Sequence, residues 1–218
     1  LHLSLRRQRQ MCIRDSEGIE GVVEPVVWLD GLDIPMLRFF DAGFAENDDA
    51  KVQHVARPEG HSLARFGHNM VPVRHDHASQ TSPIFNYPYA RSREALAQLQ
   101  KQEAPDAWLG HKLRYINPLT GGSPMPTIST NLQLLPEGFA GKTHRATDGS
   151  VYSVVEGHGS AEIAGQRFEF GPRDTFVVPS WAPLTLHAPN GDCVLFSFSD
   201  RPVQQAMGIL REAFLENA

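Results

Sequence analysis

The feature that most constrains this sequence is a series of short apolar segments between residues 108 and 199, separated by turns rich in glycine and proline. Many short segments of this kind at regular spacing are typical of a β-sandwich or a β-barrel. An all-β domain is therefore expected over 107–201. The predicted strands are 112–116, 127–135, 151–155, 160–164, 167–170, 175–178, 184–188 and 192–199.

The turns between these segments resemble the two motifs of a cupin. Gly138 and His144 are separated by five residues, as in the first motif, and Gly157 stands where that motif closes. The strings GPRD at 171–174 and PSW at 179–181 resemble the second motif. The resemblance implies a cupin barrel (a jelly roll, or double-stranded β-helix) with flanking helices.

The metal-ligand positions of the cupin pattern are mostly vacant. A metal-binding cupin places His-x-His and a Glu on adjacent inner strands and one more His in the second motif, and such imidazoles can hold divalent iron with open positions. The four positions here hold His144, Ala146, Ser150 and Leu184. We therefore predict no metal ligands, an apolar interior, and a hydrogen-bonded structural role for His144. Strand alternation puts His187 on the face opposite Leu184.

The residues before the barrel divide into three parts. The segment 17–46 is predicted to hold a strand at 26–29 and a helix from Asp33, with Asp33 as N-cap and Pro35 in the first turn. The connector 47–106 is polar and irregular, apart from an edge or bridging strand over 82–90 and a helix capped by Ser92. We interpret residues 1–16, which lack an initiating Met, as non-native or, alternatively, as a disordered basic tail.

The chain is expected to end in a helix over 203–215, within the segment 202–218. Its net charge of −5 argues against a nucleic-acid or anionic-membrane partner. Two cysteines, Cys12 and Cys193, form no disulfide framework, which favours the reducing cytoplasm. No run of 18 apolar residues is present, so no membrane-spanning helix is predicted.

Five long strings give a more specific resemblance. They resemble, in the same order, the gentisate/salicylate dioxygenases, a family of two-cupin ring-cleaving enzymes. The strings are VVWLDGLDIP (26–35), SPIFNYPYARSREAL (82–96), LRYINPLTGGSPMPTI (113–128), FGPRDTFVVPSWAPL (170–184) and FSFSDRPVQQAMG (196–208).

This resemblance implies an Fe(II)-dependent oxidoreductase that opens an aromatic ring, with a small aromatic acid and dioxygen as partners. With gentisate the product would be maleylpyruvate. It further implies an N-terminal cupin that holds the iron, and a C-terminal cupin without iron that corresponds to this chain. Residues 17–46 then correspond to the last strand and helix of the first cupin.

Only one active-site residue carries over from the family. Asp30, in the string WLDGLD, matches an acid that lines the family's active site, and the alternative is that it merely caps the helix. No metal ligand carries over, so the chain is expected to look truncated, to bind no Fe(II) and to be inactive alone.

Several alternatives remain open at this point. His75 and His77 form a His-x-His pair that could chelate a metal on a strand, but a solvated linker is the favoured interpretation. A metal-free cupin for homo-oligomer assembly or small-molecule binding is the rival function. The sequence does not distinguish gentisate from salicylate or 1-hydroxy-2-naphthoate, nor does it give the oligomeric state.

Overall fold

The computed structural model describes residues 29–44, 46, 52, 55–75 and 77–216, and the chain divides into two compact units, 1–32 and 33–218. The segment 1–16 and most of the predicted strand at 26–29 lie outside the described residues. Of the first unit, only residues 29–32 are described. No helix in the described ranges is both long and apolar enough to cross a membrane.

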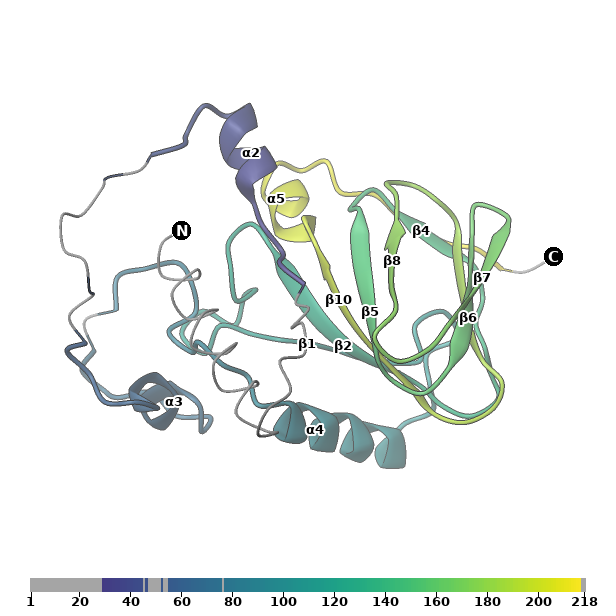
Figure 1. The fold of residues 1–218 in the computed structure, drawn as a ribbon, viewed down its shortest axis with the longest axis horizontal. Helices are drawn as coiled ribbons and strands as arrows, with labels where there is room; N and C mark the ends of the chain where they lie inside the picture. Colours follow the sequence, from purple (N-terminus) through teal and green to yellow (C-terminus); the bar gives the residue numbers. More distant parts are fainter. Residues whose placement is uncertain (1–28, 45, 47–51, 53–54, 76, 217–218) are drawn as a thin grey trace, which may run out of the picture. The chain divides into compact units, whose positions relative to one another are not determined.

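The second unit is built around two antiparallel sheets, which confirms the all-β cupin class (Figure 1). One sheet has the order β1-β2-β10-β5-β8 and the other the order β11-β4-β9-β6-β7, with β3 paired to β9. The strands are β1 His111–Arg114, β2 Ser129–Leu135, β3 Phe139–Ala140, β4 His144–Ala146, β5 Ser150–Glu156, β6 Gly159–Ile163, β7 Gln166–Phe170, β8 Thr175–Val178, β9 Leu184–Ala188, β10 Cys193–Ser199 and β11 Glu212–Phe214.

The inner faces of the two sheets enclose an apolar core, as predicted. Leu184, Leu186 and Ala188 alternate along β9 and all belong to it. Three aromatic rings form a stack, with Phe176 lying 5.0 Å from Tyr152 and 5.1 Å from Phe170. Alternation of this kind buries every second side chain of a strand in one sheet face. The full cluster is Leu135, Phe139, Tyr152, Val154, Ala161, Ile163, Phe170, Val178, Leu184, Leu186, Ala188, Cys193 and Leu195.

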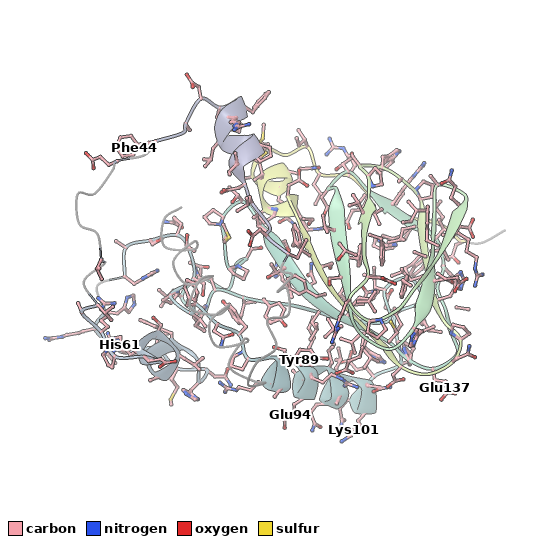
Figure 2. All side chains as sticks on the ribbon, in the orientation of Figure 1. Phe44, His61, Tyr89, Glu94, Lys101 and Glu137 are labelled. Carbon is pink, nitrogen blue, oxygen red and sulfur yellow. The ribbon has the colours of Figure 1, made fainter. Side chains whose placement is uncertain are left out.

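A second cluster joins the outer face of the five-stranded sheet to helix α4, Tyr89–Gln102. Leu96 is fully buried there against Leu132, Leu134 and Val194. Glu94 and Lys101 are exposed on the side of α4 that faces away from the sheet (Figure 2). The helix is therefore amphipathic, and burying its apolar stripe fixes it on the sheet.

Helix α4 begins earlier than predicted, and the expected strand over 82–90 is wrong. Tyr89 already lies in the helix, and the hydroxyl of Ser92 donates to the Pro88 carbonyl at 3.3 Å inside the first turn instead of capping it. Phe85 is 58% exposed, so the alternating aromatics do not share a buried face.

Two shorter helices precede α4. Helix α2, Ile34–Phe39, follows Asp33 as predicted, but the Asp33 side chain does not cap it. That carboxylate instead accepts a hydrogen bond of 2.7 Å from the hydroxyl of Thr127. The connector, predicted to be irregular here, forms α3, His61–Phe66, in a short stretch bounded by Gly60 and Gly67.

The predicted helix over 203–215 is also wrong. Helix α5 spans only Arg201–Ala206, and Gly208 then takes a φ of +70°, which favours glycine and turns the chain. The following residues form β11, which pairs with β4. Because this pairing joins residues almost 70 positions apart, local periodicity could not reveal it.

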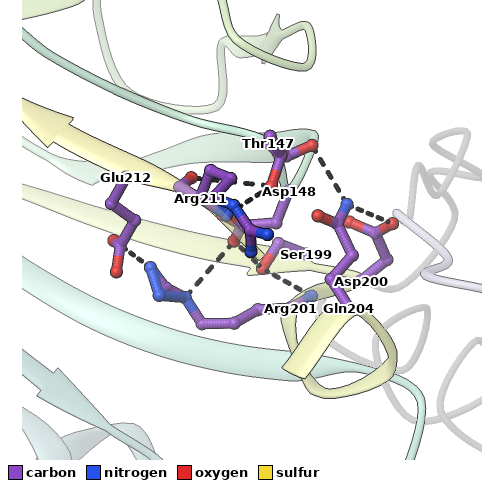
Figure 3. A network of polar contacts seen from close by, with 8 residues as sticks. All are labelled: Thr147, Asp148, Ser199, Asp200, Arg201, Gln204, Arg211 and Glu212. Carbon is purple, nitrogen blue, oxygen red and sulfur yellow. Dashed lines mark hydrogen bonds and ion pairs between the residues drawn. The ribbon is translucent and has the colours of Figure 1, made fainter. Parts of the chain in front are cut away.

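A polar network holds the turn around α5 to the barrel (Figure 3). The carboxylate of Asp148 accepts a 2.8 Å hydrogen bond from the Ser199 hydroxyl and lies 3.4 Å from Arg201 Nε. Arg201 also pairs with Glu212 of β11. The network therefore joins α5, β10 and β11 through one buried carboxylate.

Candidate functional site

Two of the four metal-ligand positions of the cupin pattern are paired directly in the β4–β9 ladder. His144 on β4 is the direct cross-strand partner of Leu184 on β9. Leu184 is only 2% exposed and packs in the core. His187 lies on the other face of β9, as predicted, while the core residues Leu186 and Ala188 flank it. The position that would complete the ligand set is thus filled by a buried aliphatic side chain.

His144 is a neutral side chain at physiological pH. Its pKa is lowered from 6.5 to about 4, chiefly by burial and further by the cations Lys112 and Arg201, while Asp106 acts in the opposite direction. Its ring stacks on Phe214 of β11, with centroids 6.1 Å apart and 15° between planes. Nδ1 has no hydrogen-bond partner among the described residues, so the expected hydrogen bond is not found at that atom.

Cations occupy the surroundings of His144. Lys112 Nζ lies 5.7 Å from the ring centroid of Tyr152, a member of the barrel core. A divalent ion beside His144 would be repelled by both Lys112 and Arg201. No group of three or more His, Cys, Asp or Glu side chains in the described part of the chain could hold a metal ion. The residues of this barrel therefore do not fit an iron centre.

The His-x-His pair of the connector, His75 and His77, does not form a metal chelate among the described residues. His75 and His77 both contact the ring of Phe66, at centroid distances of 6.1 and 6.4 Å. The Nε2–H of His77 donates to the Thr81 carbonyl at 2.8 Å, and Asp76 lies outside the described residues. This geometry makes the pair part of the connector's packing.

The two aspartates of the string WLDGLD, Asp30 and Asp33, differ in burial. Asp33 is half-buried and bonded to Thr127, which gives it a structural role. Asp30 is exposed and belongs to the first unit, of which only residues 29–32 are described. Its assignment to an active site stays a prediction.

Two features near the vacant ligand positions could not be recognised in the sequence. Trp181 takes a φ of +63°, which is unfavourable for a bulky side chain. Its backbone N–H donates to the Ala146 carbonyl at 2.7 Å. The Arg145 guanidinium lies 4.5 Å from the centre of the Trp181 indole. A local pattern carries no signal for this contact, because β4 itself was not predicted.

Comparison with known proteins identifies the relatives of this chain, although no model of a protein family matches it. Gentisate 1,2-dioxygenase 1 of Aquipseudomonas alcaligenes is 50% identical over 190 residues, which cover 87% of this chain and 54% of that protein. The chain is homologous to the gentisate and salicylate 1,2-dioxygenases. The 5-aminosalicylate 1,2-dioxygenase of a Comamonas species is 34% identical over 197 residues, covering 90% of this chain and 52% of that protein.

A solved structure of the gentisate and salicylate 1,2-dioxygenases has the same fold. The salicylate 1,2-dioxygenase of Pseudoaminobacter salicylatoxidans, in its adduct with gentisate, is 31% identical with a TM-score of 0.76. The match covers 85% of this chain and 52% of that chain. The chain thus spans about half the length of the relatives it matches.

Proposed function

We propose that this chain is the C-terminal cupin part of an Fe(II)-dependent dioxygenase that converts gentisate and dioxygen to maleylpyruvate. The observation that carries the proposal is the 50% identity to a gentisate 1,2-dioxygenase over 190 residues. An adduct of a 31% identical salicylate 1,2-dioxygenase with gentisate supports the same class of substrate.

In this proposal the iron is held by the half of the dioxygenase that the present chain does not span. Residues 17–46 would belong to the iron-bearing cupin, and 107–201 would form the second barrel, joined by the connector 47–106. Iron bound there would supply the open coordination positions for substrate and dioxygen. This chain's contribution would be Asp30, at the edge of that active site, and a rigid barrel that braces it.

The rigid-barrel role rests on the packing around His144. A leucine at the last ligand position, an apolar core and nearby cations leave the second barrel with a structural role. Cys193 is a fully buried free thiol whose pKa is raised by burial to about 12, so it stays protonated and unreactive and has a packing role in the barrel core.

The test is a chimera that joins the first half of the Aquipseudomonas enzyme to residues 17–218 of this chain. With Fe(II) and gentisate, we expect stoichiometric oxygen uptake and formation of maleylpyruvate, whereas residues 17–218 alone take up no oxygen. A chimera that folds and binds iron but leaves gentisate unchanged would refute the assignment. Turnover by the isolated chain would refute the division of roles.

A second candidate function is a metal-free cupin that assembles oligomers. The exposed aromatic side chains of Phe39, Phe40 and Phe44 favour it, because large apolar groups left exposed on a surface can mark contact sites. Light scattering after size exclusion tests this idea. A defined homo-oligomer that loses its contacts after Phe39→Ser and Phe44→Ser supports assembly, and a monomer at all concentrations contradicts it.

A further inference from the structure

A cleft of about 520 Å³ lies in the connector, between α3 and the segment 77–83. This volume is within the range of small-molecule sites in proteins. None of the residues lining the cleft belongs to the barrel or to the vacant ligand positions. The cleft is therefore separate from the site described above.

All the charged side chains in the described lining of this cleft are basic. Arg57 and Arg65 contribute two permanent positive charges, and His61 and His77 add two imidazoles. The hydroxyls of Ser62 and Ser79 provide further polar groups, and no described lining residue is acidic. The whole chain carries a net charge of −5, so this concentration of positive charge is local.

The wall formed by α3 is held in place from several sides. Phe66 is 7% exposed, and its ring contacts His75, His77 and the Arg65 guanidinium, which is 5.6 Å from the ring centroid. At the end of α3, Arg91 of α4 donates to the Gly67 carbonyl at 2.8 Å. These contacts fix the helix that presents Arg65.

The opposite wall is anchored to a loop of the barrel. The Ser82 N–H donates to the Pro124 carbonyl at 2.7 Å, and the Asn117 amide donates to the Gln80 carbonyl at 3.2 Å. The Tyr87 hydroxyl donates to the Ile116 carbonyl at 2.7 Å. Both walls are thus held by contacts within the chain, and a preorganised site loses less entropy on binding.

From this geometry we propose that the cleft binds a small oxyanion, a carboxylate or a phosphate group. Guanidinium groups match both anions through paired N–H donors, and the hydroxyls and imidazoles can complete the shell. A cation would be repelled by Arg57 and Arg65, and an uncharged apolar ligand would offer no acceptor to either guanidinium group.

Titration of ¹⁵N-labelled protein with benzoate and with inorganic phosphate tests the proposal. We expect saturable NMR shifts centred on residues 57–83 at low chloride concentration. The double variant Arg57→Gln/Arg65→Gln should lower the affinity at least about tenfold, since losing even one charge-assisted hydrogen bond weakens binding by about this factor. Arg65→Lys retains the positive charge but not the paired N–H donors of the guanidinium, so a smaller loss of affinity is expected.

Arg167→Gln is the matched control, because Arg167 is an exposed arginine on β7, away from the cleft. It should leave the affinity unchanged. Saturation by benzoate alone identifies a carboxylate ligand, and saturation by phosphate alone identifies a phosphorylated one. The proposal is overturned if neither anion saturates, if the shifts lie outside 57–83, or if Arg167→Gln weakens binding as much as the double variant.

Discussion

His144 and Leu184 face each other as direct partners in the β4–β9 ladder. One is the single surviving residue of a cupin ligand set, and the other fills the position of a missing ligand with a buried aliphatic side chain. The pair shows how a barrel of this fold can dispense with a metal, because the space of the ligands is used for apolar packing.

Restoring the missing ligands should restore metal binding. We expect the triple variant Ala146→His/Ser150→Glu/Leu184→His to gain thermal stability when Co(II) is added, since metal binding to the folded state is linked to folding. Adding Lys112→Met should tighten binding further, because it removes a neighbouring cation. Leu184→Asn alone serves as control: it should cost about 2–4 kcal/mol and, because His144 is then the only imidazole of the set, give no response to metal. If Co(II) does not raise the thermal stability of the triple variant, the side chains at these four positions do not converge on one site.

The pKa of His144 predicts a loss of stability in mild acid. The unfolded chain takes up a proton as the pH falls through about 6.5, whereas the folded chain does so only near pH 4. The contribution of neutral His144 is present above pH 6.5 and is lost as the pH falls towards 4, by at most about 3 kcal/mol. Urea unfolding at pH 7 and pH 4.5 should show a smaller pH dependence for His144→Leu. An identical dependence in both proteins would contradict the assignment.

The buried ion pair of Asp148 and Arg201 predicts non-additive effects. Arg201→Leu leaves the Asp148 carboxylate, whose side chain is 7% exposed, without its cation, and should cost about 2–4 kcal/mol. Asp148→Asn keeps an acceptor for Ser199 and should cost less. We expect the double variant to be more stable than the sum of the single losses by about 1 kcal/mol or more, measured by urea unfolding. Strict additivity would mean that the pair does not interact.

Two glycines of the first cupin motif should differ in their tolerance of a methyl group. Both take positive φ, +75° at Gly157 and +77° at Gly138. A Cβ at Gly157 would lie 2.2 Å from the Asp192 carbonyl oxygen, whereas at Gly138 nothing lies within 4 Å. Gly138→Ala should therefore cost only about 1–2 kcal/mol of backbone strain, and Gly157→Ala at least about 3 kcal/mol. Equal thermal shifts for the two variants would argue against this packing.

Asp30 and Asp33 can be separated in the chimeric dioxygenase. Asp30→Asn should lower kcat at least about tenfold while the iron content is retained, because the proposed role is to orient substrate or water. Asp33→Asn can still accept the Thr127 hydrogen bond and should leave kcat unchanged. If Asp30→Asn turns over gentisate normally, Asp30 has no part in the reaction.

The strands with distinct turns at both ends were predictable from the sequence. The segments 175–178 and 184–188 were placed at their observed bounds, since glycine and proline punctuate them on both sides. The vacant ligand positions followed equally from motif spacing.

The errors arose where distant contacts override local patterns. A helix is expected over 203–215 from the sequence, but pairing with β4 makes 212–214 a strand. Asp33 had the sequence signature of a cap, yet its carboxylate is bonded to Thr127, 94 positions away. The cleft at Arg57 and Arg65 has no local sequence signature either, because its walls are held together only through contacts with α4 and the barrel loop.

Strand β11 also bears on how this barrel avoids self-association. It covers the edge of β4, whose backbone groups would otherwise be open to another chain. The other edge of the same sheet, β7, displays Arg167 and Glu169, both largely exposed and paired at 2.7 Å. Charged side chains and short covering strands are the devices by which sheet edges discourage intermolecular pairing. Deleting 210–218 should therefore cause fibrillar or amorphous aggregation under conditions in which the barrel core is still folded.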